Sequence, residues 1–383
     1  MRKLTLLLLL AAMVTTTAFA QRGAASPSLL KRITVEQLEQ VLSAAQGKRD
    51  AQVAQELYGL VLTERLSTIR LSHWDGQLPG RQSRRALVAL ADESAFLDLP
   101  AAETPVTAAP DLEVQHHMMA LTVEYITKAV HQLPNFFATR TTTSFEDEPW
   151  QPDRVQAESF PLHAIGGQPL KFVDRDRATI LYGKGWEVHS SAIPSAPNAR
   201  GLNASVRFGP ILGTAMLDAA HQTLVWSHWE QGAAGPEAIF NYGVPAERSH
   251  YLVEYCCIYG KDGKKLVRFQ EYSGYHGQIA VDPSNGTVLR LVLRADPKPP
   301  DPFVLADVAV EYGNVKIGGK TYFCPVRSVA LSRGLPFRAT AADDKAVLQT
   351  MLNDVAFEKY HLFWSGKSAQ DYNWSWTMAT PGP

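Results

Sequence analysis

The sequence predicts an α+β protein: a strongly curved, open antiparallel β-sheet of about ten strands, a half-barrel with covering helices, preceded by a small helical module. Apolar residues recur at helical spacing before residue 98 and again over 112–133. From Arg140 onward the pattern alternates with period two, and the connections between alternating segments are short. Such short connections cannot make parallel crossovers, so we expect antiparallel strands. A two-sheet sandwich is the competing architecture.

The N-terminus has the three parts of a secretory signal peptide. Residues 2–3 are basic, residues 4–14 are apolar, and residues 18–20 (Ala-Phe-Ala) form a small-x-small cleavage site. We expect cleavage between Ala20 and Gln21 and a mature chain that is periplasmic or secreted. The apolar run is shorter than the roughly 20 residues that a membrane-spanning helix needs. No cysteine follows the cleavage site directly, so lipid attachment there is not expected.

Residues 21–97 are predicted to form the helical module. Thr34 and Gln37 fit a capping box, because their side chains and main chains can exchange hydrogen bonds at the start of a helix, which then ends at Gly47. Two further helices are expected, one from Asp50 to about Arg70 and one capped by Ser83, and the Pro- and Ala-rich residues 98–111 are expected to be a linker.

Residues 112–383 are predicted to form the half-barrel domain. A helix over 112–133 leads into the strand NFFATRTTTSFED, and a second helix is expected at 210–220 because proline favours the first helical position. Turn residues between alternating segments predict four hairpins. The hairpins pair 178–182 with 186–190, 251–259 with 265–272, 278–281 with 287–294 and 305–317 with 321–331, and further strands are expected at 222–231, 237–244 and 351–361.

The charge balance argues against two classes of partner. Two of the 37 basic residues lie in the signal peptide, so the mature chain with its 38 acidic residues has a net charge of about −3. Nucleic acids and anionic membranes both require a concentrated basic surface. The sequence indicates neither partner, and it contains no transmembrane segment after the signal.

Three cysteines leave the disulfide pattern open. Successive side chains in a strand point to opposite faces, so Cys256 and Cys257 are poorly placed to bond each other. Cys257 and Cys324 each lie on the apolar face of a predicted strand. A Cys257–Cys324 disulfide is therefore one expectation, and buried free thiols are the other.

Two acidic groupings could carry chemistry. His228 and Glu230 lie on one face of a predicted strand with His221 nearby, as an acid/base pair or two metal ligands would. A solvated strand face explains the same residues. Asp174 and Asp176 share a face of an extended segment, as two catalytic carboxylates would, although alternating charges more often form exposed ion pairs.

The remaining candidates are isolated. His116 and His117 are neighbours on a helix and point about 100° apart, so they cannot chelate one ion alone. His276 lies beside a glycine and suits a loop, and Cys256 would need a stabilised thiolate, which Glu254 disfavours. No nucleophile elbow, phosphate loop, zinc-binding helix or dinucleotide fingerprint is present. We therefore expect no catalytic residue, no metal site and no cofactor.

The order of elements resembles a known family. A long helix running into NFFATRTTTSFED, followed by GYHGQIAVDPSNGTVLRLVLRAD and VAVEYGNVKIGGKTYFCPVRSVAL, resembles the half-barrel of outer-membrane lipoprotein carriers and their sorting-protein relatives. It looks still more like a group of uncharacterised secreted bacterial proteins. The resemblance covers roughly residues 112–361, and the module before residue 98 has no counterpart in the compact carriers. No motif allows a functional residue to be carried across.

The resemblance implies a concave apolar surface that can hold an acyl chain or a lipid-modified partner. The leading hypothesis is therefore a non-enzymatic periplasmic binding or carrier protein for a lipid or a hydrophobic partner. The first alternative is an envelope interaction or assembly module that recruits a partner through its N-terminal helices. The second is a hydrolase of unknown type.

Overall fold

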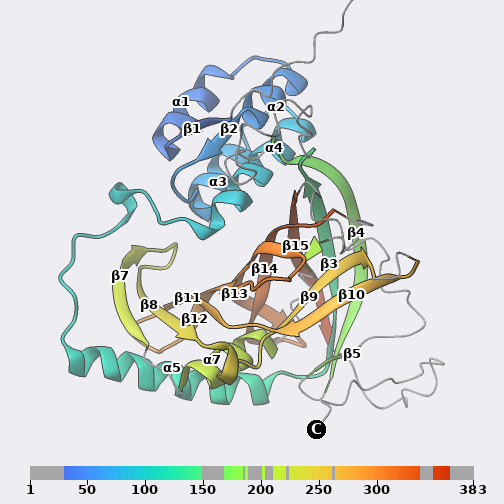
Figure 1. Ribbon diagram of the computed structural model, residues 1–383. Coiled ribbons are helices and arrows are strands. Elements are labelled where there is room, and N and C mark those ends of the chain that lie inside the picture. Colours follow the sequence, from blue (N-terminus) through green and yellow to red (C-terminus); the bar gives the residue numbers. More distant parts are fainter. Residues whose placement is uncertain are drawn as a thin grey trace, which may run out of the picture.

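The fold is that of a computed structural model, which describes residues 30–148, 168–183, 186–188, 201–202, 210–220, 224–260, 264–336 and 348–362. These residues form the predicted α+β protein, with an N-terminal helical module against one face of a large antiparallel sheet that stays open (Figure 1). The expected signal cleavage site at Ala20 and Gln21 lies outside the described residues, as does His221.

The large sheet confirms the predicted half-barrel of about ten strands. Its order is β5-β4-β3-β15-β14-β13-β12-β11-β8-β7, and each neighbouring pair is antiparallel. β15, the last described strand, pairs with β3, so strands from the two ends of the strand series are neighbours inside the sheet. The strands are Phe136–Glu146 (β3), Lys171–Gly183 (β4), Trp186–Val188 (β5), Val225–Gln231 (β7), Pro236–Val244 (β8), Tyr275–Val281 (β11), Val288–Ala295 (β12), Phe303–Ile317 (β13), Lys320–Gly334 (β14) and Gln349–Leu362 (β15).

One predicted hairpin lies outside this sheet. The strands Leu252–Tyr259 (β9) and Leu266–Tyr272 (β10) pair with each other as expected, but they join Gly201–Leu202 (β6) in a separate three-stranded sheet. In the large sheet β8 pairs with β11, although β9 and β10 lie between these two strands in the sequence. Alternation and turn residues predict a hairpin but do not determine which sheet it joins, because that choice depends on distant partners.

The inner face of the large sheet, defined as the face that bears the three-stranded sheet and two helices, is apolar. The helices Leu112–Gln132 (α5) and Pro210–Ala220 (α7) lie side by side along it (Figure 1). α7 has the predicted bounds, and α5 ends one residue before its predicted end. Asp111 caps α5 by accepting a hydrogen bond from the Val114 N–H at 2.9 Å. Two clusters of buried side chains fill the contact between this face and its cover. Within the described chain, no helix is long and apolar enough to cross a membrane.

The outer face, defined as the face that bears the helical module, has a smaller apolar centre. Ala89 and Phe96 from the module pack there against side chains such as Val292 and Leu352. The module consists of Lys31–Ile33 (β1), Val35–Ala44 (α1), Asp50–Tyr58 (α2), Leu60–Leu62 (β2), Thr68–Asp75 (α3) and Arg81–Glu93 (α4), followed by short 3₁₀ turns at Ser94–Phe96 (η1) and Ala101–Glu103 (η2). The second turn lies in the predicted linker.

The module confirms the start of the first predicted helix, which ends at Ala44 and not at Gly47, and corrects two others. Thr34 and Gln37 form the capping box of α1. The predicted helix from Asp50 to about Arg70 is wrong, because α2 ends at Tyr58 with Gly59 as its C-cap. The next apolar residues form β2, which pairs in parallel with β1.

The third helix begins before its predicted cap. Gly80 is the N-cap of α4, so Ser83 lies in its first turn. Asp50 from α2 accepts hydrogen bonds from the Gln82 and Ser83 N–H groups at 3.0 and 2.8 Å, and from the Ser83 hydroxyl at 2.7 Å. A carboxylate from another helix therefore supplies the cap that the local sequence assigns to Ser83.

The β11–β12 turn positions α5 through a glycine. Gly286 has a φ of +73°, and a Cβ atom there would overlap the main chain of Leu121 and Thr122 in α5. Gly286→Ala should lower the unfolding free energy by more than about 2 kcal/mol, because it adds this overlap to the backbone strain. Gly319, with a φ of +83° and open space around it, is the matched control, and Gly319→Ala should cost only about 1 kcal/mol. Urea denaturation measures both changes. Equal losses of unfolding free energy in the two variants would contradict the close contact between Gly286 and α5.

Candidate functional site

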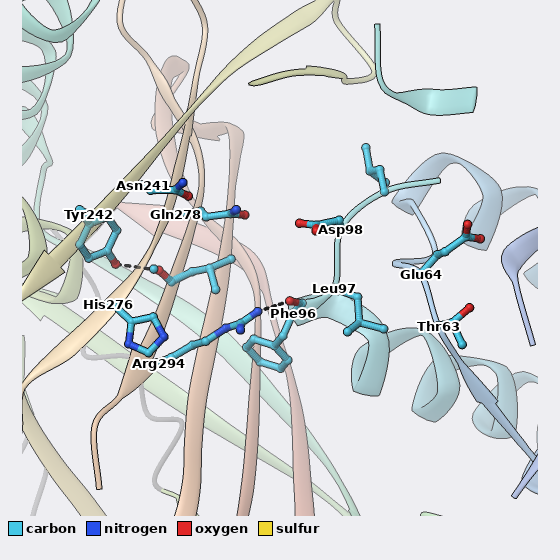
Figure 2. A pocket seen from close by; sticks show the side chains of 13 residues that line it. Thr63, Glu64, Phe96, Leu97, Asp98, Asn241, Tyr242, His276, Gln278 and Arg294 are labelled. Carbon is cyan, nitrogen blue, oxygen red and sulfur yellow. Dashed lines mark hydrogen bonds between the residues drawn. The ribbon is translucent and has the colours of Figure 1, made fainter. Parts of the chain in front are cut away.

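A cleft lies where the helical module meets the outer face of the sheet (Figure 2). Its volume of about 460 Å³ is within the range of small-molecule sites, roughly 300–1,000 Å³. One wall comes from the chain after β2 and from the segment after η1, and the other from β8, β11 and β12. The lining residues are Thr63, Glu64, Phe96, Leu97, Asp98, Leu99, Asn241, Tyr242, His276, Gly277, Gln278, Val292 and Arg294.

Strand register brings the polar side chains of the sheet wall together. Gln278 on β11 lies opposite Asn241 on β8, and His276 lies opposite Arg294 on β12. Directly opposed residues in an antiparallel pair point to the same face, so these four side chains form two adjacent rows on the outer face. Figure 2 shows Asn241 and Gln278 side by side, facing Asp98 on the other wall.

The two amide side chains are available to a ligand. Asn241 is exposed and Gln278 half-buried, and neither amide makes a hydrogen bond to any described residue. Each amide can donate and accept hydrogen bonds. Arg294, by contrast, is already occupied, because it donates to the Phe96 carbonyl and lies 3.8 Å from a carboxylate oxygen of Asp307.

A buried ion network adjoins the cleft and holds the module to the sheet. Arg65 of the module and Arg290 of β12 both donate to the Glu230 carboxylate, the latter at 2.9 Å. Nε2 of His228 lies 3.2 Å from the other oxygen of that carboxylate. Burial alone would raise the pKa of Glu230, but these neighbours, Arg290 most strongly, lower that pKa well below its usual value.

The structure therefore brings His228 and Glu230 together but gives Glu230 a structural role. A carboxylate held by two guanidinium groups stays ionised, and its lowered pKa makes it a poor acceptor for a substrate proton. The alternative of a solvated strand face is also wrong for Glu230, which is 3% exposed. Glu230 is buried because the module places Arg65 over it. The alternation of the strand does not show that the module covers this face.

The other predicted candidates lie apart from one another. His276 lines the cleft, and its Nδ1 lies 2.9 Å from Asp296 in a half-exposed pair. His116 and His117 are exposed on α5. Asp174 accepts a hydrogen bond from the Arg175 N–H and makes no ion pair with a described residue. Among the described side chains, no three His, Cys, Asp or Glu residues are grouped as metal ligands.

The cysteine pairing differs from the predicted Cys257–Cys324 disulfide. Cys256 is bonded to Cys257, and Cys324 is a buried free thiol. Cys257 lies on β9 of the three-stranded sheet and Cys324 on β14 of the large sheet. The prediction fails because the alternation of side chains within a strand does not determine which cysteines of two separate sheets come together. Cys256 is therefore part of a disulfide. Burial raises the pKa of the Cys324 thiol to about 12.

Buried carboxyl groups also mark the contact between the module and the sheet. Glu93 at the end of α4 and Asp147 after β3 both have raised pKa values, each because of burial first. The pKa of Glu93 rises to about 7, and the negative charge of Asp147 contributes to the rise. Glu93 is thus protonated in the folded protein at pH values where the unfolded chain has released the proton.

Comparisons of the chain with protein-family models, with curated proteins and with solved structures found no match. The cleft is thus characterised by its own geometry. Sequence reasoning missed Asn241, Gln278 and Asp98, because a polar residue on a period-two strand or in a loop has the same signal whether it faces solvent or a cleft.

The disulfide assignment predicts a labelling pattern. In denaturant without a reductant, iodoacetamide should modify Cys324 alone, and all three cysteines should react only after reduction. Under native conditions Cys324 should stay unmodified because it is buried and protonated. Peptide mass mapping measures this, and Cys324→Ser should abolish labelling before reduction. A peptide that links Cys257 to Cys324 would contradict the assignment.

Glu93 predicts a pH dependence of stability. Its folded-state pKa of about 7 exceeds the unfolded value of about 4.3, so the free energy of unfolding should fall as pH rises through this window. Glu93→Gln should therefore stabilise the protein by roughly 1–3 kcal/mol at about pH 8 and change it little at about pH 5. Chemical denaturation at the two pH values measures this. The exposed Glu247→Gln is the control, and a pH-independent effect of Glu93→Gln would refute the prediction.

Proposed function

We propose that this protein is a non-enzymatic binding protein that holds a small, polar molecule in the cleft between the helical module and the sheet. The observation that carries the proposal is the pair of amides of Asn241 and Gln278. They lie side by side in a cleft of ligand size and have no hydrogen-bond partner among the described residues. Buried binding sites commonly combine apolar walls with a few such polar groups, and Phe96, Leu99 and Val292 supply the apolar walls here.

The lining side chains favour binding over catalysis. Amides do not transfer protons near neutral pH, so Asn241 and Gln278 can hold a ligand but not act as an acid or a base. The hydroxyl of Thr63 donates to the Ile33 carbonyl at 3.2 Å. Within the described lining, no hydroxyl or thiol lies in hydrogen-bond contact with a base, which nucleophilic catalysis requires.

The polar groups of the cleft favour a ligand that can donate hydrogen bonds. Glu64 accepts a hydrogen bond from the Val35 N–H at 3.0 Å, and Arg294 is bound to the Phe96 carbonyl. The Asp98 carboxylate has no partner in the described chain and faces the amides (Figure 2). A molecule rich in hydroxyl or amide groups could donate to Asp98 while it exchanges hydrogen bonds with Asn241 and Gln278.

A second candidate is the carrier of a lipid or lipid-modified partner that the family resemblance implies. It puts the ligand on the inner face, where the described side chains already fill two apolar clusters, so an acyl chain would have to displace α5 or α7. The observation in its favour is that Ile211, Tyr251 and Tyr312 contact both clusters and remain partly exposed. These three side chains mark a seam by which an apolar ligand could enter.

Native mass spectrometry of the mature protein, purified from the periplasm without denaturation, tests the two candidates. We expect a co-purifying small polar molecule that is lost from the Asn241→Ala/Gln278→Ala variant. The control is Asn314→Ala, which removes an exposed amide on β13 and should leave the bound mass unchanged. A lipid that both variants retain would favour the carrier, and a wild-type protein with no bound mass would refute the cleft proposal.

A further inference from the structure

Strand β4 separates its charges by face. Within the segment Asp174–Arg177, Arg175 and Arg177 lie opposite Thr143 and Thr141 of β3, whereas the aspartates lie opposite the intervening β3 residues. Thr141 and Thr143 lie on the same face of β3 as Phe145, which packs in the apolar centre of the outer face. The two arginines therefore point to the outer face and the two aspartates to the inner face. The expected exposed ion pairs within this segment do not form.

Helix α4 adds two arginines to the same region. The Arg85 guanidinium carbon lies 3.5 Å from the centroid of the Phe172 ring, and Phe172 precedes Arg175 on β4. The pKa of Arg85 is lowered, first by burial and then by the positive charges of Arg81 and Arg175. α4, which is distant from β4 in the sequence, thus brings further positive charge to the outer face at β4.

These four arginines have no compensating carboxylates among the described residues. Arg81, Arg85, Arg175 and Arg177 form no ion pair with any described residue. The nearby Glu148 carboxylate is already paired with Lys171 at 2.9 Å. Like charges that are held together without counter-ions repel one another. Binding of an anionic partner would reduce this repulsion.

We propose that Arg81, Arg85, Arg175 and Arg177 form a docking surface for the phosphate groups of an anionic membrane. Guanidinium groups bind phosphate oxygens in a bidentate manner. Three of the four side chains are exposed, which suits a broad surface better than a small ligand. Val173, 42% exposed on the same strand, offers an apolar contact for the interface.

The docking surface and the cleft lie near opposite ends of the large sheet. β4 is second from one end of the strand order, and β8 is second from the other. Contact of β4 and α4 with a membrane would therefore leave the cleft beside β8 open. The two proposals are independent, and either can fail without the other.

Co-sedimentation with vesicles tests the docking surface. The mature protein should bind vesicles that contain phosphatidylglycerol and phosphatidylcholine, should not bind phosphatidylcholine alone, and should be released by salt because the charges are exposed. Each arginine near an anionic membrane strengthens binding roughly fivefold, so Arg175→Gln/Arg177→Gln should weaken it about 25-fold. Arg175→Lys/Arg177→Lys keeps the charge and should retain most of the binding.

The matched control is Lys316→Gln/Lys320→Gln, which removes two exposed charges near the β13–β14 turn and should not change vesicle binding. Equal weakening by the two glutamine variants would overturn the proposal, because it would reduce the effect to overall charge. Failure of the wild type to bind the anionic vesicles would also overturn it. So would binding of soluble polyphosphate without vesicle binding, since the partner would then be a soluble anion.

Discussion

The structure depends on one constraint: the central strands of the large sheet are apolar on both faces and therefore need two covers. On β12 Leu291 and Leu293 face inward while Val292 faces outward, and on β13 Val310 and Ala309 divide in the same way. Strands buried on both sides read as continuous apolar runs. α5, α7 and the three-stranded sheet cover one face, and the helical module covers the other. Both surfaces that we propose as binding sites lie at the margins of this second cover.

Two ion networks fix where the module sits on the outer face. Glu230 joins Arg65 of the module to Arg290 of the sheet, and Arg327 of β14 joins Asp92 of α4 to Asp354 of β15. Buried ion pairs add little net stability, because desolvation of the charges offsets their attraction, but a misplaced partner leaves an unpaired buried charge. The two networks therefore determine how the module is oriented on the sheet. They also determine the shape of the cleft, because one of its walls belongs to the module and the other to the sheet.

Most of the fold could be predicted from the sequence, because its signals are local. α7 has the predicted bounds, and the hairpins around β11–β12 and β13–β14 lie within a few residues of the predicted ones. The errors concern distant partners. β1 converts residues 60–62 into a strand, Asp50 replaces Ser83 as a cap, and Asn241 and Gln278 become site residues only because the module packs opposite them.

The average charge of the chain is a poor guide to its surface for the same reason. A net charge of −1 argues against an anionic partner only if acidic and basic residues mix at every point of the surface. Period-two geometry prevents such mixing on β4, since neighbours of opposite charge point to opposite faces. α4 then adds its arginines to one of those faces, beyond the reach of the aspartates on the other. A nearly neutral chain can therefore carry a strongly basic surface, and strand register with helix packing determines where that surface lies.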